Sequence, residues 1–436
     1  MNGTVKIKGG KRLCGEVEPI PNKNSFMAAL PAALLTSEDV IYKNVPGTSD
    51  VGRFLEIYED LGASVKRRGG DVVINCKNVK KSYVEARVAK EFRSSFMFAG
   101  PMLARFGRAR VPMPGGCLLG TRSVAAHVDA FSKLGVKVAY KNGYYDFVLG
   151  KSLPKKVKIW QLEASVTGTE NLILLAAGLD MELEIIDAAS EPHVTDLLKM
   201  LGKMGVRVEG MGSNRLKIGG RKKMAGAVFE AVPDYIDIAG LMTAVGITNG
   251  EVLIKGANRD EVVGGLRRWF GLFGLEFEEE GKDLLVKVSK RGLRVKTDTG
   301  FPMAGEKLPK LRPRPWPGFP VDALPVITTL ACKAYGRVLM HNWMYENGFD
   351  FVRELNRLGA NIFMADPQRV IVPKGRVKFK GGEVAPPPVI QGTKAVFLAS
   401  LADKVETVVH GVDVLKRRYP NVVETYKSLG ADIEWV

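Results

Sequence analysis

Several polar side chains stand beside apolar helical segments or in glycine-rich turns, where they could bind or react with an anion. Lys23 directly precedes one such segment, and a lysine beside the free amides of a helix N-terminus makes a phosphate-binding site. Taken alone, Lys23 is better explained as a solvated lysine next to an asparagine N-cap. Its role as an anion ligand therefore depends on other motifs in the chain.

Cys117 is the second candidate, because it follows Gly115-Gly116 in a Pro/Gly-rich loop and not in an apolar segment. Arg122, five residues further on, favours the thiolate, which is the reactive form of cysteine. A lone cysteine is more often a small core residue, but core cysteines rarely occupy Gly-Gly loops. The other cysteines fall in strand or helix patterns and are interpreted as structural: Cys14, Cys76 and Cys332.

Acidic and basic residues near other apolar segments have ordinary explanations of their own. Asp322 lies in the first turn of such a segment, where a carboxylate complements the helix dipole. Asp234 and Asp237 open another, and capping explains them as well as a substrate role does. Arg417 belongs to the run Lys416-Arg417-Arg418, and charge runs usually form a solvated face.

A sixfold repeat organises these residues. An apolar-Gly-apolar phrase ends six amphipathic segments, and its glycines are separated by 73, 70, 69, 85 and 71 residues. Such a glycine takes the left-handed conformation that ends a helix, and an alternating strand follows it. The six glycines are Gly62, Gly135, Gly205, Gly274, Gly359 and Gly430.

A second landmark precedes each glycine by 36 to 41 residues: a polar turn that opens an Ala/Leu-rich helix. We predict helix starts at Asn24, Ser94, Thr169, Asp237, Asp322 and Thr393. The extra residues of the long fifth interval therefore lie before Asp322, in 298–320. This stretch contains Pro309 to Pro317, and it predicts a rigid, basic surface insertion.

Each repeat is interpreted as strand, apolar helix, strand, amphipathic helix, strand. Helices that are apolar nearly all round, such as Phe26 to Leu35, belong inside a domain, and their amphipathic partners belong outside. Because one repeat cannot bury such a helix alone, several must pack together. We predict an α/β (α+β) fold of two similar domains, 1–22 with 232–436 and 23–231, with three repeats each and a cleft between them.

Length and composition fit a cytoplasmic globular protein of two or three domains. The chain has 436 residues, of which 46% are hydrophobic. Its longest apolar run covers ten residues, too few to cross a bilayer, and its first residues lack the layout of a signal peptide. Four cysteines and four histidines have no metal-ligand spacing, so we expect no disulfide framework, no metal and no cofactor.

The formal net charge of +17 is distributed over short, separate runs of lysine and arginine. This pattern favours a solvated surface, or a general attraction for small anionic substrates, over a continuous nucleic-acid track.

Six such repeats in two similar domains resemble the enolpyruvyl transferase family over the whole chain. Four phrases extend the resemblance to the branch that acts on UDP-N-acetylglucosamine: Pro21–Asn24, Pro114–Arg122, Ser165–Asn171 and Gly318–Asp322. The Gly-Gly-Cys loop is the most specific of them, because the branch that acts on shikimate 3-phosphate normally lacks that cysteine. The resemblance implies an inside-out α/β barrel-like fold with the active site in the cleft between the domains.

The function implied by this resemblance is transfer of the enolpyruvyl group of phosphoenolpyruvate to the 3-hydroxyl of UDP-N-acetylglucosamine, with release of phosphate. This is the first committed step of peptidoglycan synthesis, and thus of cell wall biogenesis. The chemistry needs a general base for the hydroxyl, a general acid for C3 and several cations around the anionic groups. Both small molecules are the expected partners; neither a membrane nor a nucleic acid is expected.

The resemblance also implies roles for individual residues. Asp322 activates the hydroxyl, Cys117 delivers the proton to C3, and Lys23 and Arg417 bind phosphoenolpyruvate. Cys117 would then be the residue that the epoxide fosfomycin alkylates. The further substrate-binding residues implied are Asn24, Arg93, Arg122, Ser165, Val166 and Gly168.

Two positions depart from the family pattern and leave alternatives open. An Asp-Leu-Arg-Ala phrase of the relatives is replaced here by a stretch that includes Gln391, and a common arginine by Gly348. One alternative is an enolpyruvyl transferase for a different acceptor, such as shikimate 3-phosphate. The other is a basic nucleic-acid-binding protein that has kept the fold without turnover, which the net charge and the stretch Pro309 to Pro317 favour.

Overall fold

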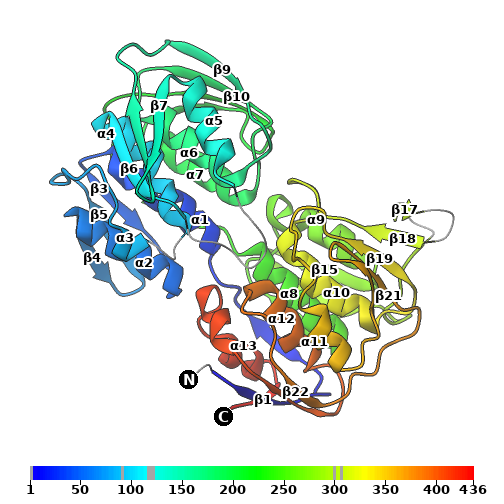
Figure 1. The fold of residues 1–436 in the computed structure, drawn as a ribbon. Helices are drawn as coiled ribbons and strands as arrows, with labels where there is room; N and C mark the ends of the chain where they lie inside the picture. The colour runs from blue at the N-terminus through cyan, green and yellow to red at the C-terminus, as the bar shows by residue number, and fades with distance from the viewer. Residues whose placement is uncertain (1–2, 90–92, 115–122, 298–300, 305–307) are drawn as a thin grey trace. The chain divides into compact units, whose positions relative to one another are not determined.

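The computed structural model describes residues 3–89, 93–114, 123–297, 301–304 and 308–436. Its chain divides into two compact units (Figure 1). One contains the chain up to Ile20 together with Pro233–Val436, and the other contains most of Pro21–Val232. We call them the 233–436 unit and the 21–232 unit. The domain boundaries predicted from the sequence, after residues 22 and 231, lie close to these points. The assignment of the two units as domains stays a prediction.

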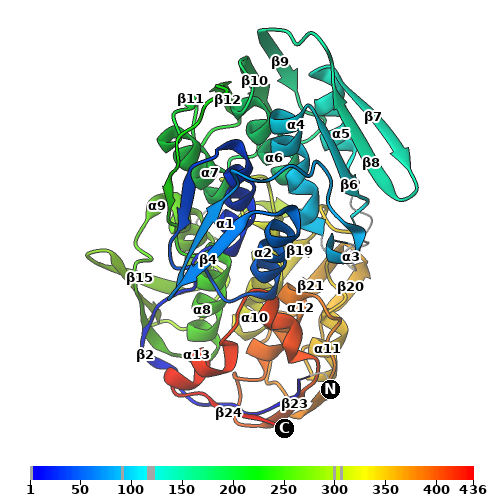
Figure 2. The same cartoon turned by 90° about the vertical axis from the view of Figure 1, so that its left-hand side faces the viewer.

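Three apolar helices form the centre of the 233–436 unit: α8 (Tyr235–Ile247), α10 (Leu324–Lys333) and α12 (Ile390–Ala399). They contact one another, and Figures 1 and 2 show them side by side. Every residue of α8 is buried, as expected for a helix that is apolar on all faces. Around them lie α9 (Asp260–Gly271), α11 (Val352–Arg357), α13 (Val422–Ser428) and the short 3-10 helices η3 (Val321–Ala323) and η4 (Val412–Arg417).

Three sheets cover these helices in the described part of the unit. The first contains β2 (Cys14–Val17), β14 (Glu251–Ile254), β15 (Leu275–Glu280) and β16 (Asp283–Val288). The second contains β17 (Met303–Ala304), β18 (Leu308–Leu311), β19 (Val338–His341), β20 (Phe363–Asp366) and β21 (Arg369–Val372). The third contains β1 (Val5–Lys8), β22 (Gly382–Val384), β23 (Glu406–Val409) and β24 (Asp432–Trp435).

The N-terminal strand completes the sixth repeat. β1 lies between β23 and β24 and is antiparallel to both, with Ile7 opposite Thr407 on one side and Ile433 on the other. The next strand, β2, runs parallel to β14 of the fourth repeat. The first residues of the chain are thus held in two sheets of the 233–436 unit.

The 21–232 unit repeats the same plan. Its inner helices are α1 (Lys23–Ala29), η1 (Leu30–Leu35), η2 (Arg93–Phe98), α4 (Ala99–Phe106) and α6 (Val166–Ala177), and its outer helices are α2 (Ser49–Leu61), α3 (Ala86–Ala89), α5 (Ala125–Lys133) and α7 (Pro192–Lys203). One of its sheets contains β3 (Asp39–Tyr42), β4 (Ser64–Arg68), β5 (Asp71–Asn75) and β13 (Val228–Phe229). Another contains β6 (Arg108–Pro112), β7 (Val136–Lys141) and β8 (Tyr144–Leu149). A further sheet contains β9 (Lys156–Trp160), β10 (Glu182–Ile186), β11 (Arg207–Glu209) and β12 (Arg215–Gly219).

The repeat glycines end the outer helices as predicted. All six have φ between +84° and +99°, in the left-handed region that residues with a Cβ rarely adopt. The predicted helix starts are less accurate. α6 begins at Val166 and not at Thr169, because Ser165 caps it through its side chain; α12 begins at Ile390 and not at Thr393.

We expected residues 298–320 to form a surface insertion, and this expectation is wrong for many of the described residues in that range. β18 adds to the sheet beside β19, with Leu311 opposite Met340. Leu311 and Phe319 are buried, and the Trp316 ring packs 5.2 Å from that of Tyr235. Apolar side chains between the prolines therefore anchor this segment in the 233–436 unit.

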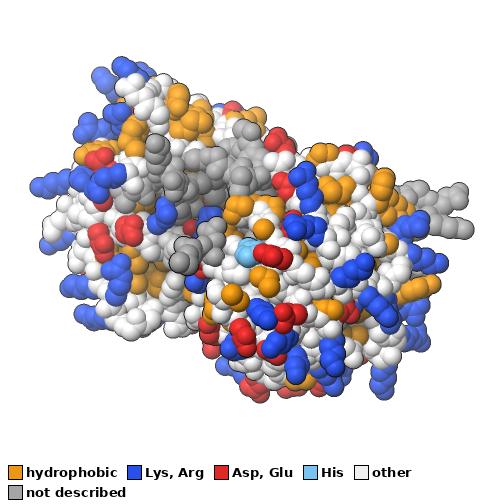
Figure 3. Space-filling model, turned by 60° about the horizontal axis from the view of Figure 1, so that its bottom comes forward, with side chains coloured by type: hydrophobic (Ala, Val, Ile, Leu, Met, Phe, Trp, Pro, Cys, Tyr) orange, Lys and Arg blue, Asp and Glu red, His pale blue; other side chains and the backbone are white. Residues whose placement is uncertain are grey.

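Basic side chains are scattered over the face shown in Figure 3, where acidic and apolar groups lie between them. Many are paired with carboxylates, as Lys155 is with Asp180 and Lys255 with Asp283. This distribution agrees with a solvated surface. Among the described residues, no helix has the length and apolar character that crossing a membrane requires.

Candidate functional site

Five charged side chains form a cluster in the 233–436 unit, four of them buried and one partly exposed: Asp234, Asp237, Lys394, Arg418 and, partly exposed, Asp322. Asp234 is the N-cap of α8, and its Oδ1 accepts the backbone N–H groups of Ile236 and Asp237. The Arg418 guanidinium donates to both oxygens of this carboxylate, from Nε at 2.9 Å and from Nη2 at 3.0 Å. Such a two-pronged pair holds both side chains in one geometry.

Asp322 is the member of the cluster that reaches solvent. Its side chain is 22% exposed, whereas those of Asp234 and Arg418 are at most 2% exposed. It belongs to η3, which leads into α10, and its Oδ2 lies 3.8 Å from Arg418 Nη1. A partly exposed carboxylate is accessible to a bound hydroxyl group and can accept its proton.

Lys394 supplies the second cation of the cluster from within α12. Its Nζ lies 4.1 Å from the centre of the Tyr419 ring, 4.6 Å from that of Tyr426 and 4.0 Å from Asp237 Oδ1. Burial lowers the pKa of Lys394 to about 8, although the Asp237 carboxylate opposes this effect. Burial likewise raises the pKa of Asp237, against the influence of Lys394.

Arg418 keeps its charge in this environment. Burial acts against the guanidinium cation, but the neighbouring carboxylates, Asp234 first, outweigh it and raise the pKa of Arg418 above its ordinary value. The cluster therefore presents a permanent cation next to Asp322.

In the 21–232 unit, Lys23 is the first residue of α1, and Asn22 caps the helix by accepting from the N–H groups of Asn24 and Ser25. Lys23 is not a solvated lysine, because its side chain is 10% exposed and its Nζ donates to Asp50 Oδ2 at 2.7 Å. Asp50 lies in the first turn of α2. An anion that binds Lys23 would have to share the ammonium group with this carboxylate.

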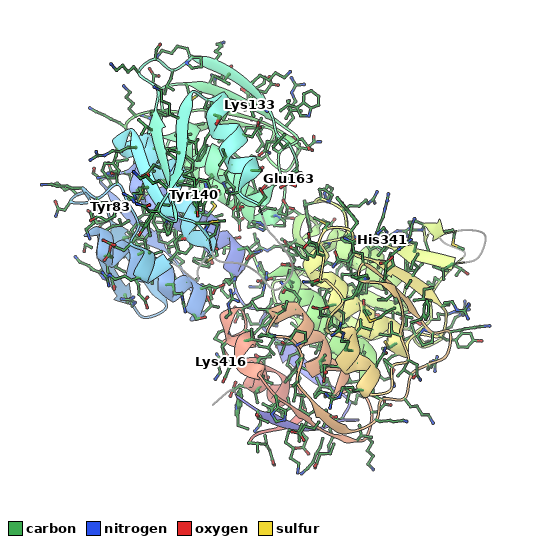
Figure 4. All side chains as sticks on the ribbon, viewed as in Figure 1. Tyr83, Lys133, Tyr140, Glu163, His341 and Lys416 are labelled. Atoms are coloured by element: carbon green, nitrogen blue, oxygen red, sulfur yellow. The ribbon has the colours of Figure 1, made fainter. Side chains whose placement is uncertain are left out.

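The Ser165–Asn171 motif forms the start of α6, just after Glu163, which Figure 4 labels. Ser165 Oγ accepts the N–H of Gly168 at 3.3 Å. Asn171 joins α6 to the preceding helices, since its Nδ2 donates to the Phe96 carbonyl and its Oδ1 accepts the Gly100 N–H. These contacts explain the motif locally, and the substrate contacts of Ser165, Val166 and Gly168 stay predictions.

The remaining predicted residues differ in how far the structure describes them. Cys117 and Arg122 lie outside the described residues, and Arg93 is the first residue of η2. Arg417 is the exposed last residue of η4, next to Lys416, which Figure 4 labels. Their roles in substrate binding and catalysis stay predictions.

Two of the other cysteines are buried. Burial raises the pKa of Cys76 and of Cys332 to about 12, which keeps both thiols protonated and fits their interpretation as structural residues. Cys14 is exposed in β2. Within the described ranges, His, Cys, Asp and Glu side chains form no group of three that could hold a metal ion.

A pocket opens beside Asp322, entirely within the 233–436 unit. Its wall includes Asn342, which follows His341 at the end of β19 (His341 is labelled in Figure 4), and Gln391 at the start of α12. It also includes Gly348. The two positions that depart from the family pattern, 348 and 391, therefore line the same pocket.

Sequence reasoning missed Arg418, Lys394 and Asn342. A lone charged residue inside the otherwise uncharged and mostly apolar segment 390–399 was a signal that could have identified Lys394. Arg418 is hidden in a run of basic residues, and nothing in the sequence distinguishes it from the exposed Arg417 beside it.

Comparison with protein families gives one match over nearly the whole chain. The model described as EPSP synthase (3-phosphoshikimate 1-carboxyvinyltransferase) matches residues 7–426. Curated relatives named UDP-N-acetylglucosamine 1-carboxyvinyltransferase include that of Borreliella burgdorferi, which is 34% identical and aligns over 99% of this chain and 98% of its own length. That of Treponema denticola is 35% identical and aligns over 98% of both chains.

Solved structures of lower sequence identity share the fold. The enolpyruvyl transferase NikO from Streptomyces tendae matches with a TM-score of 0.86 at 20% identity, covering 100% of this chain and 99% of its own. EPSP synthase from Acinetobacter baumannii matches with a TM-score of 0.71 at 17% identity over the whole of both chains.

Proposed function

The chain belongs to the enolpyruvyl transferase family, and from this membership we propose that it transfers the enolpyruvyl group of phosphoenolpyruvate to the 3-hydroxyl of UDP-N-acetylglucosamine. It is a transferase, and the step belongs to peptidoglycan synthesis. The observation that carries the proposal is identity of 34–35% to carboxyvinyltransferases for this acceptor over at least 98% of the chain. Phosphoenolpyruvate and UDP-N-acetylglucosamine are its small-molecule partners.

Asp322 is our candidate for the general base. In the reaction, the sugar hydroxyl oxygen attacks C2 of phosphoenolpyruvate and its proton passes to the Asp322 carboxylate. The exposure of Asp322 supports this role, because it leaves the carboxylate accessible to a ligand. Arg418 lies 3.8 Å behind it and acts as a positioning residue, since its guanidinium also holds the Asp234 carboxylate.

Cys117 is our candidate for the general acid that gives C3 its proton. The product of this addition is a tetrahedral intermediate with the sugar oxygen, the carboxylate and the phosphate on C2. The Cys117 thiolate left by the first step then takes a proton from C3, and the double bond re-forms as phosphate leaves with the oxygen that joined it to C2. Lys23 and Arg417 supply positive charge for the phosphate and carboxylate groups.

We also propose that the protein acts in the cytoplasm, which its few, scattered cysteines favour. A different acceptor is the competing proposal. It draws on the family model, which is described by its shikimate-phosphate enzyme, and on the replacement of two common arginines by Gly348 and Gln391.

Phosphate release from phosphoenolpyruvate tests the proposal against its competitor. Purified protein is incubated with phosphoenolpyruvate and either UDP-N-acetylglucosamine or shikimate 3-phosphate. We expect phosphate release with UDP-N-acetylglucosamine and none with shikimate 3-phosphate. Asp322→Asn should lower the rate of this release by about 100-fold or more. Release only with shikimate 3-phosphate would establish the other acceptor. Absence of turnover together with tight, steeply salt-dependent binding to DNA or RNA would favour the nucleic-acid alternative.

A further inference from the structure

The pocket beside Asp322 is lined by residues from separate segments of the 233–436 unit. We call it the Asn342 pocket and define it by Asp322, Asn342, Gly348, Asp350, Phe351 and Gln391. It opens next to the carboxylate assigned to the reacting hydroxyl, so a group bound in it lies close to that hydroxyl. A role for this pocket in acceptor binding rests on the proposed function.

The side-chain amide of Asn342 has a defined orientation. Its Oδ1 accepts the backbone N–H groups of Met344 at 3.3 Å and Tyr345 at 3.1 Å. Only the oxygen of an amide can accept two N–H groups, so Nδ2 must face away from this turn. Asn342 is 1% exposed, and the hydrogen bonds that its side chain makes within the described residues are the two at Oδ1. A ligand that accepts a hydrogen bond from Nδ2 would satisfy this amide donor in the pocket wall.

Gly348 is the residue that leaves room for this donor. A Cβ at position 348 would lie 1.9 Å from Asn342 Nδ2 and 2.7 Å from its Cγ. Any larger residue would push the amide away from its place in the wall. The replacement of a common arginine by glycine is therefore linked to the position of Asn342.

The charge of the pocket is unfavourable for anions. Among the described residues, its wall contains two carboxylates, Asp322 and Asp350, and no lysine or arginine. Arg418 lies 3.8 Å from Asp322, but its guanidinium already donates to both oxygens of Asp234. A phosphate or carboxylate in the pocket would meet two negative groups without a cation in this wall to offset them. Apolar side chains such as Phe351 supply the rest of the surface.

We propose that the Asn342 pocket selects the acceptor by an uncharged, carbonyl-bearing substituent next to the reacting hydroxyl, and that Asn342 determines this specificity. The acetamido group of an N-acetylated sugar has this chemistry: its carbonyl accepts from Asn342 Nδ2 and its methyl group contacts apolar wall. An acceptor with an anionic substituent at that place is rejected.

Calorimetric binding of two sugar nucleotides tests the proposal without requiring turnover. UDP-N-acetylglucosamine is compared with UDP-glucose, which lacks the acetamido group, on wild type and on Asn342→Asp. The aspartate keeps the oxygen that accepts from Met344 and Tyr345 but replaces the donor. Wild type should prefer the acetamido sugar by about 10-fold, and the variant should lose about 10-fold in affinity for it while binding UDP-glucose within about threefold of wild type. Asn361→Asp, an exposed change in the same unit, controls for the added charge.

A second variant reaches the same atom if Asn342→Asp does not fold. Gly348→Ala adds only the methyl group that displaces Nδ2, and it should abolish the preference for the acetamido sugar. Equal losses for both sugars, no preference in wild type, or binding of shikimate 3-phosphate as tight as that of UDP-N-acetylglucosamine would each overturn the proposal. Selective binding without phosphate release would rule out the proposed function and leave the specificity role of Asn342 standing. Phosphate release without selective binding would support the proposed function and rule out that role of Asn342.

Discussion

Arg417 and Arg418 are adjacent in the chain and have opposite surroundings. Arg417 is exposed at the end of η4, whereas Arg418 is 2% exposed and bound to Asp234. Removing one partner of a buried ion pair leaves the other charge without compensation, which is costly, whereas a surface charge contributes little to stability. The two arginines should therefore serve different purposes, the first in ligand binding and the second in holding Asp234 and Asp322.

Substitution of each arginine by glutamine separates these purposes. Arg418→Gln should lower the free energy of unfolding by about 3–5 kcal/mol, because it strands the buried Asp234 carboxylate. Arg417→Gln should change stability by no more than about 0.5 kcal/mol while it raises KM for phosphoenolpyruvate. Urea denaturation and initial rates of both variants provide the measurement. Equal stability losses would contradict the different roles.

The thiol of Cys117 offers a chemical test of the proposed general acid. Cys117→Ser should lower turnover by roughly 100-fold to 10,000-fold, and Cys117→Asp should retain much of it, because a carboxylic acid can also deliver a proton. Fosfomycin should add once, to Cys117, as mass spectrometry of the digested protein would show. Cys76 and Cys332, whose pKa values burial raises to about 12, should stay unmodified. Active protein with an unmodified Cys117 would end the assignment.

Two glycines of the α2 region test whether the repeat glycines are needed for their left-handed conformation. Gly52 and Gly62 both belong to the α2 region, and a Cβ at either would meet no atom within 4 Å. Gly62 has φ +86°, so an alanine there would be strained, whereas Gly52 has ordinary helical surroundings. Gly62→Ala should destabilise the protein by about 1–2 kcal/mol, and Gly52→Ala should stabilise it by about 0.5–1 kcal/mol. Thermal unfolding of both variants would check the opposite signs.

Lys394 in α12 makes the free energy of unfolding depend on pH. In the folded protein the pKa of Lys394 is about 8, below the ordinary value of 10.5. Between these values the unfolded chain holds a proton that the folded chain lacks, so this group makes stability rise with pH. Below pH 8 the buried ammonium group costs about 3 kcal/mol, and this cost disappears as pH approaches 10.5.

Comparison with Lys394→Met isolates this contribution. From pH 8 to pH 10.5, wild type should gain about 3 kcal/mol in unfolding free energy relative to the variant. Lys416→Met, at an exposed position, controls for the loss of a lysine. If the difference in unfolding free energy between wild type and Lys394→Met stays constant with pH, then folding does not lower the pKa of Lys394.

For the molecule as a whole, local signals predicted the repeats and distant contacts produced the site. A glycine that ends a helix and a helix that is apolar all round depend on a few neighbouring residues, so both were visible in the sequence. The pair of Asp234 and Arg418 joins residues 184 positions apart, and it forms only when the N-cap of α8 and the residue that follows η4 come together in one unit. The direction of the Asn342 amide likewise depends on the backbone of Met344 and Tyr345.

An oxygen label tests the central claim most directly. Phosphoenolpyruvate carrying ¹⁸O in the bridge between C2 and phosphorus is incubated with UDP-N-acetylglucosamine and the protein. If phosphate leaves C2 of a tetrahedral intermediate, all of the label appears in phosphate, and mass spectrometry finds an unlabelled enolpyruvyl group on the sugar nucleotide. Label that stays in pyruvate, with the sugar nucleotide unchanged, would mean cleavage between oxygen and phosphorus and would contradict enolpyruvyl transfer.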